Sequence, residues 1–85
     1  MNATGYAPPG PIDQPPYLGY EKTEVRLAAF ADALEGVELG AYDRRVIGWL
    51  AGWDDPTCRT VVSLIWRARR AAAQAAQAAE AHDGE

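Results

Sequence analysis

The chain has 85 residues and a formal net charge of -4, so it has room for one domain with a modest core. Its hydrophobic content of 48% is largely alanine, which favours helix but buries little apolar area. A single cysteine cannot form an intrachain disulfide, which excludes the disulfide-stabilised class of small secreted domains. The large core residues lie between Val25 and Trp66, and the core is expected there.

Residues 1–20 lack the basic start and the apolar run of a secretory signal, and no stretch is long enough for a membrane-spanning helix. Together with the lone Cys58, this predicts a soluble, cytoplasmic protein without a membrane segment. The charge is unevenly distributed. Residues 1–40 hold six acids and two bases, whereas residues 41–70 hold three acids and six arginines, so the middle of the chain is basic.

Residues 1–22 hold five prolines and three glycines, which exclude helix and favour extended, polyproline-like backbone. The composition predicts a flexible N-terminal arm. Tyr17 and Tyr20 are unusual in a purely solvated linker, so part of the arm either lies across the helical body or docks on a partner. The sequence leaves both alternatives open.

A helical domain is expected over residues 23–81, and its first helix is predicted to begin at Thr23 as the N-cap. Leu27, Phe30 and Leu34 recur at helical spacing on its apolar face, and Arg26 is expected to lie off that face. Gly36 or Gly40 is expected to end this helix.

A second helix is predicted over residues 41–53 by a stripe of large apolar side chains that we expect to face the core. Three indoles, at positions 49, 53 and 66, must supply much of the burial available to so short a chain, so they are expected to anchor the fold. The stripe consists of Tyr42, Val46, Trp49, Leu50 and Trp53.

A third helix is predicted from the run DDPT at residues 54–57, which places an acidic N-cap directly before proline. The alanine-rich residues 71–81 should extend it to about 26 residues, and residues 82–85 are expected to fray. The predicted fold is therefore all-α, with three helices of which the last is long. The apolar face of this helix holds Cys58, Val61, Val62, Ile65 and Trp66, and its polar face holds Arg59, Ser63, Arg67 and Arg70.

The residues that carry chemistry do not form a catalytic, cofactor-binding or metal-binding pattern. Structural zinc needs four ligands, and the chain offers only Cys58 and His82. The Asp54-Asp55 pair is explained better by helix capping than by a hard cation. Cys58 lies on the apolar stripe, so a buried structural thiol is favoured over a reactive one. The sequence therefore predicts a non-enzymatic protein without cofactor or metal.

The alanine extension predicts a helical partner, because a helix that projects beyond a small body cannot be packed by it. Small residues let another helix approach closely, and we expect a homodimer through this seam. The alternative is a solvated helix that needs no packing, since alanine is a strong helix former. The predicted interface consists of Ala68, Ala72, Ala75 and Ala79, with Tyr17 and Tyr20 of the arm.

Nucleic-acid binding is the alternative function, because two helices joined by a tight turn resemble a helix-turn-helix with an arginine face. In that interpretation Arg59, Arg67 and Arg70 would contact phosphates. Asp54 and Asp55 oppose it, since they occupy the end of the helix that would approach the bases and would repel the phosphate backbone.

Residues 39–50 read LGAYDRRVIGWL and are followed by WDDPT at 53–57 and VVSLI at 61–65. This pattern of tyrosine, paired arginines, tryptophans and a D-x-x-T helix start resembles small helical proteins of actinobacteria and their phages. The resemblance covers residues 39–70 only. It implies the helical fold and brings neither a function nor a binding residue.

Overall fold

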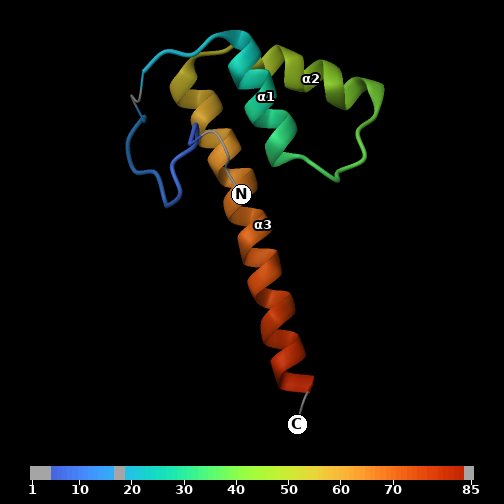
Figure 1. Cartoon of the computed structure of the whole chain (residues 1–85). Coiled ribbons are helices and arrows are strands. Elements are labelled where there is room, and N and C mark those ends of the chain that lie inside the picture. The colour runs from blue at the N-terminus through green and yellow to red at the C-terminus, as the bar shows by residue number, and fades with distance from the viewer. Residues whose placement is uncertain (1–4, 17–18, 84–85) are drawn as a thin grey trace.

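The computed structural model describes residues 5–16 and 19–83, and these contain three helices and no strand (Figure 1). The helices are α1 (Thr23–Ala33), α2 (Ala41–Ala51) and α3 (Asp55–Asp83). α1 packs against both α2 and α3, while α3 continues well past its neighbours. The predicted all-α fold with a long last helix is confirmed. α2 ends two residues before its expected end at Trp53, and α3 includes residues 82 and 83.

The turn into α3 is capped by an acidic side chain, as predicted. Asp54 Oδ1 accepts a hydrogen bond from the Thr57 backbone N–H at 2.8 Å. α3 therefore begins at Asp55, one residue earlier than the run DDPT suggested, and Pro56 lies within the first turn, where its missing N–H costs nothing. This register leaves the Asp55 carboxylate available for other donors.

α1 differs from its prediction at both ends and in its buried face. Lys22 occupies the N-cap position, and Thr23 instead accepts a hydrogen bond from Arg26 Nη2 at 3.2 Å. After Ala33 the chain turns through Gly36, whose φ of 86° favours glycine. Phe30 is buried, as expected, but Leu27 is 39% exposed. The buried positions of α1 are Arg26, Ala29, Phe30 and Ala33, so Arg26 takes a place on the buried face that Leu27 was expected to hold.

The prediction that the indoles anchor the core is wrong for two of the three. Trp49 and Trp53 are 61% and 46% exposed, whereas Trp66 is half-buried against the core. α2 meets the core through its other side, because the carbonyls at its C-terminal end accept hydrogen bonds from Arg26 and Cys58. These contacts turn Ile47, Leu50 and Ala51 inward.

Candidate functional site

A buried carboxylate joins the arm, α1 and the start of α3. Asp55 Oδ1 accepts a hydrogen bond from the Tyr6 hydroxyl at 2.9 Å, and Oδ2 accepts one from the Glu21 N–H at 2.7 Å. Arg26 Nη1 lies 3.4 Å from Oδ1, and both side chains of this ion pair are at least nine-tenths buried. Burial pushes the pKa of Asp55 upward, but these donors hold it below its ordinary value. Asp55 therefore stays ionised inside the protein.

The prediction for Arg26 is wrong: it was expected to lie off the apolar face of α1, but its side chain is buried. Its Nε donates to the Ala51 carbonyl at 2.6 Å and its Nη1 to the Glu21 carbonyl at 2.5 Å. A signal for its burial exists in the sequence: Ala29, Phe30 and Ala33 follow Arg26 at positions i+3, i+4 and i+7. Arg26 ties α1 to the end of α2, so it positions α2 on the body.

The described part of the arm lies on the predicted polar face of α3. Arg59 donates to the Tyr6 carbonyl at 2.5 Å and to the Gly19 carbonyl at 3.1 Å, and its guanidinium lies 4.2 Å from the centroid of the Tyr6 ring. Ser63 donates to the Pro8 carbonyl at 2.7 Å. Arg59 and Ser63 are consequently buried, although helical periodicity put both toward solvent.

The arginines proposed for nucleic acid are engaged with the protein itself. Arg59 is only 3% exposed, Arg67 donates to Ser63 Oγ at 3.1 Å, and Arg70 donates to the Pro9 carbonyl. Arg69 donates to the carbonyls of Ala33 and Glu35 after α1, at 2.9 and 2.8 Å. Arg59 and Arg70 therefore fasten the arm to α3, and Arg69 fastens the end of α1 to it.

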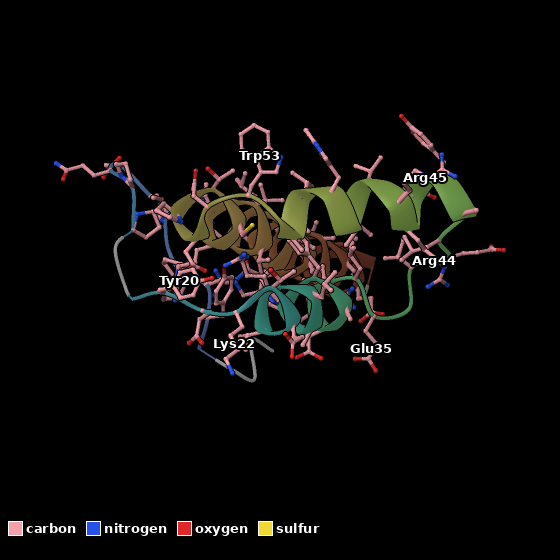
Figure 2. The ribbon with its side chains drawn as sticks, turned by 90° about the horizontal axis from the view of Figure 1, so that it is seen from above. Tyr20, Lys22, Glu35, Arg44, Arg45 and Trp53 are labelled. Atoms are coloured by element: carbon pink, nitrogen blue, oxygen red, sulfur yellow. The ribbon has the colours of Figure 1, made fainter. Side chains whose placement is uncertain are left out.

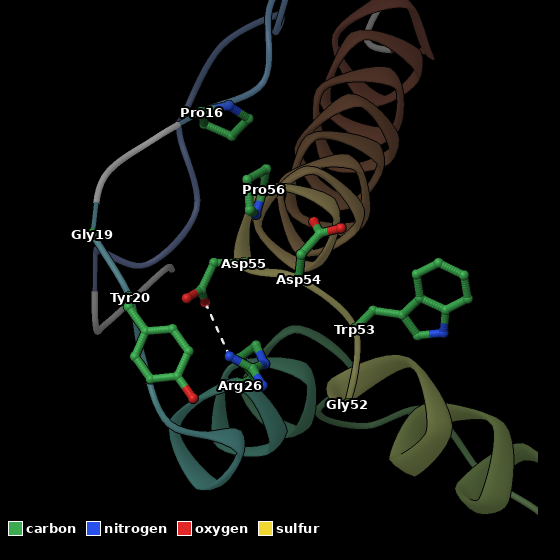
Figure 3. A pocket seen from close by; sticks show the side chains of 9 residues that line it. All are labelled: Pro16, Gly19, Tyr20, Arg26, Gly52, Trp53, Asp54, Asp55 and Pro56. Atoms are coloured by element: carbon green, nitrogen blue, oxygen red, sulfur yellow. Dashed lines mark hydrogen bonds and ion pairs between the residues drawn. The ribbon is translucent and has the colours of Figure 1, made fainter.

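A cavity of about 570 Å³ opens between the arm, α1 and the turn into α3 (Figure 3). The Arg26–Asp55 pair lies beside Tyr20, while Trp53 points away from that pair. Asp54 is the exposed carboxylate here, and the Thr57 N–H lowers its pKa. The buried charges of Arg26 and Asp55 neutralise each other. The cavity is lined by Pro16, Gly19, Tyr20, Arg26, Gly52, Trp53, Asp54, Asp55 and Pro56.

Cys58 is buried, as predicted for a structural thiol, and donates to the Leu50 carbonyl with an Sγ to O distance of 3.1 Å. Burial raises the pKa of its thiol, which disfavours the nucleophilic thiolate. Across residues 5–16 and 19–83, metal-ligating side chains do not gather in groups of three or more. None of the described helices is both long enough and apolar enough to cross a bilayer.

The aromatic side chains of α2 and of the turn after it face outward. Tyr42 is 73% exposed, and Trp49 and Trp53 form an edge-to-face pair with their ring centroids 5.2 Å apart. In Figure 2, Trp53 projects away from α1. The predicted stripe is thus divided: Leu50 packs against the core as expected, whereas Tyr42, Trp49 and Trp53 lie on the surface. We call Tyr42, Val46, Trp49 and Trp53 the α2 face; Val46 is half-buried.

The second half of α3 projects beyond the body (Figure 1). Every residue from 71 to 80 is exposed, as is Ala68, and Leu64 is 52% exposed. The body therefore leaves the alanine seam of Ala68, Ala72, Ala75 and Ala79 uncovered, as expected. Two tyrosines were also predicted for the interface. Tyr20 is 80% exposed, and the centroid of its ring lies 5.7 Å from the Arg26 guanidinium. Tyr17 lies outside the described residues.

No family model, curated protein or solved structure matches the chain. The resemblance of residues 39–70 to proteins of actinobacteria and their phages stays a prediction.

Proposed function

We propose that this chain is a non-catalytic protein-interaction and assembly module that binds a polypeptide through the α2 face. One observation carries the proposal: Tyr42 and Trp49 of α2, and Trp53 just after its end, are exposed, while Ile47, Leu50 and Ala51 of the same helix pack into the core. Exposed apolar patches of this kind mark interaction sites, and tryptophan and tyrosine dominate the binding energy of protein interfaces.

The energy available from this face is large for so small a protein. Covering a large apolar side chain stabilises a complex by on the order of 2 kcal/mol. Trp49 and Trp53 together would contribute a sizeable share of a micromolar affinity, which corresponds to about 8 kcal/mol. Arg45 lies one turn from Tyr42 and is exposed, and arginine is also enriched at interfaces.

A photo-cross-linking amino acid at position 49 tests the proposal in cells of the organism that encodes the protein. We expect a discrete adduct with one polypeptide after irradiation. The matched control carries the same amino acid at Asp32, which is exposed on α1. Absence of an adduct at position 49, or the same adduct from position 32, would contradict the proposal.

We propose further that the protein works in the cytoplasm and catalyses no reaction. The buried, unpaired Cys58 supports a reducing compartment, since oxidising compartments favour disulfides in domains this small. Its raised thiol pKa and the engagement of Asp55 with protein donors support the absence of catalysis.

Nucleic-acid binding is the weaker proposal. It needs Arg59, Arg67 and Arg70 to face phosphates, whereas Arg59 is buried under the arm. Filter binding of duplex DNA at low salt tests it. Retention that is lost on substituting Arg67 and Arg70 by alanine would support it, and no retention would remove it.

A further inference from the structure

The residues of two exposed surfaces follow the same spacing along the sequence. The α2 face places its residues at positions 42, 46, 49 and 53, and the alanine seam of α3 at 68, 72, 75 and 79. In sequence both follow intervals of four, three and four residues, the pattern by which one helix inserts knobs into the holes of another. The first three residues of the α2 face lie on α2, and Trp53 follows two residues after its end. The α2 face carries three aromatic rings and a valine, whereas the seam carries only methyl groups. Large residues pack best against small ones across such a contact.

The two surfaces cannot meet within one chain. α2 is fixed to the body at its C-terminal end by hydrogen bonds from Arg26 and Cys58. The seam lies mainly on the part of α3 that projects away from α1 and α2 (Figure 1). A second copy of the chain can supply what each surface lacks.

We propose, building on the function proposed above, that two copies assemble with the α2 face of each packed on the alanine seam of the other. Figure 1 shows α2 lying across the direction of α3. A two-fold axis that bisects the two helix directions therefore brings α2 of each copy alongside α3 of the other. Both contacts then form at once, as closure of a symmetric dimer requires. The seam spans eleven residue steps, about 16 Å along α3. On α2 the face spans seven steps from Tyr42 to Trp49, about 10 Å, and Trp53 extends it past the end of the helix with its ring 5.2 Å from that of Trp49.

The area of this contact suits a stable dimer. Tyr42, Trp49 and Trp53 retain 73%, 61% and 46% of their exposure. With roughly 200 Å² for each aromatic side chain, they offer about 350 Å² per copy. Two such faces and the seams that they cover bury about 1,400 Å², within the range of about 1,200–2,000 Å² for specific complexes.

Charge selects the antiparallel direction. Arg44 and Arg45 lie beside Tyr42 at the start of α2, and Glu80 lies beside Ala79 at the far end of the seam. An antiparallel contact brings these opposite charges together and places Trp53 near Ala68. A parallel contact would instead bring Arg44 and Arg45 toward the arginines at 67, 69 and 70.

Complementation between two variants tests the pairing. The first variant, Trp49→Ser with Trp53→Ser, loses the α2 face. The second, Ala72→Gln with Ala75→Gln and Ala79→Gln, blocks the seam with a residue that also favours helix. We expect the wild type to dimerise in sedimentation velocity and each variant alone to be monomeric. An equimolar mixture should regain a heterodimer through its one intact contact, with a dissociation constant at least about tenfold weaker than the wild type.

Each other result overturns the pairing. A dimer of the first variant alone means that seam packs on seam, and a dimer of the second alone means that α2 packs on α2. Failure of the mixture to associate also contradicts the proposal, provided circular dichroism shows both variants helical. If the wild type is monomeric but position 49 cross-links to another protein, the pairing fails and the proposed function stands. If it is monomeric and gives no adduct, both fail.

Discussion

The two halves of α3 differ in which side chains are exposed to solvent. From residue 55 to 66, polar side chains are buried: Asp55, Arg59 and Ser63 lie under the arm and α1. From residue 71 to 80, apolar alanines are exposed. Side-chain polarity therefore does not decide burial here. Proline-rich backbone leaves carbonyls without a competing local N–H, and an arginine or serine on the facing helix supplies the missing donor.

The largest expected effect comes from breaking the buried network of the first half. Asp55→Ala leaves Arg26 charged and buried without its partner, so the free energy of unfolding should fall by about 3–5 kcal/mol. Urea unfolding at low protein concentration measures it. Asp54→Ala is the matched control, and it should cost less because Asp54 is exposed and only caps the helix. Equal losses from the two variants would contradict the structure.

The same carboxylate should make stability depend on pH. Its folded-state pKa is lowered, so its contribution is present above the unfolded pKa of about 4 and is lost as pH falls through the folded value. Burial and the hydrogen bond to Asp55 raise the pKa of Tyr6 above its usual range, so stability should also fall as pH rises beyond about 10. Unfolding midpoints across pH check both limbs. Asp55→Asn should flatten the acid limb and Tyr6→Phe the alkaline one.

A smaller effect is expected where the arm meets the middle of α3. Ser63→Ala removes the donor to the Pro8 carbonyl and should lower the free energy of unfolding by about 1 kcal/mol. Thr60→Ala is the control, because the Thr60 hydroxyl donates to the Pro56 carbonyl of its own helix. Proteolysis within residues 5–16 should accelerate for Ser63→Ala and not for Thr60→Ala. Unchanged cleavage would mean that this contact does not hold the arm.

The smallest effect on the body is expected from the second half of α3. Ala75→Pro should interrupt the exposed extension, so far-ultraviolet circular dichroism should report less helix. The free energy of unfolding of the body should change by no more than about 0.5 kcal/mol, since residues 71–80 are exposed. Val62→Pro breaks the buried half of the same helix and should destabilise by about 3 kcal/mol or more. Similar losses from both prolines would contradict the difference between the halves.

Local signals predicted much of the fold. The acidic cap before Pro56, the long alanine-rich helix, the burial of Cys58 and the uncovered seam all follow from residues close together in sequence. The network around Asp55 did not follow, because its partner Tyr6 lies 49 residues away and helical periodicity records only polarity. The α2 stripe was recognised but assigned to the core. α2 carries apolar residues on both sides, and the hydrogen bond from Arg26 to Ala51, which local patterns do not show, selects the inward side.

The central claim is that the α2 face packs on a second copy of the chain rather than in the core. Sedimentation equilibrium of the wild type and of Trp49→Ser over a wide concentration range tests it most directly. We expect the wild-type mass to rise toward twice the monomer value and the variant to stay monomeric with unchanged helix content. A wild type that is monomeric at every concentration, or a variant that associates equally well, would contradict this account.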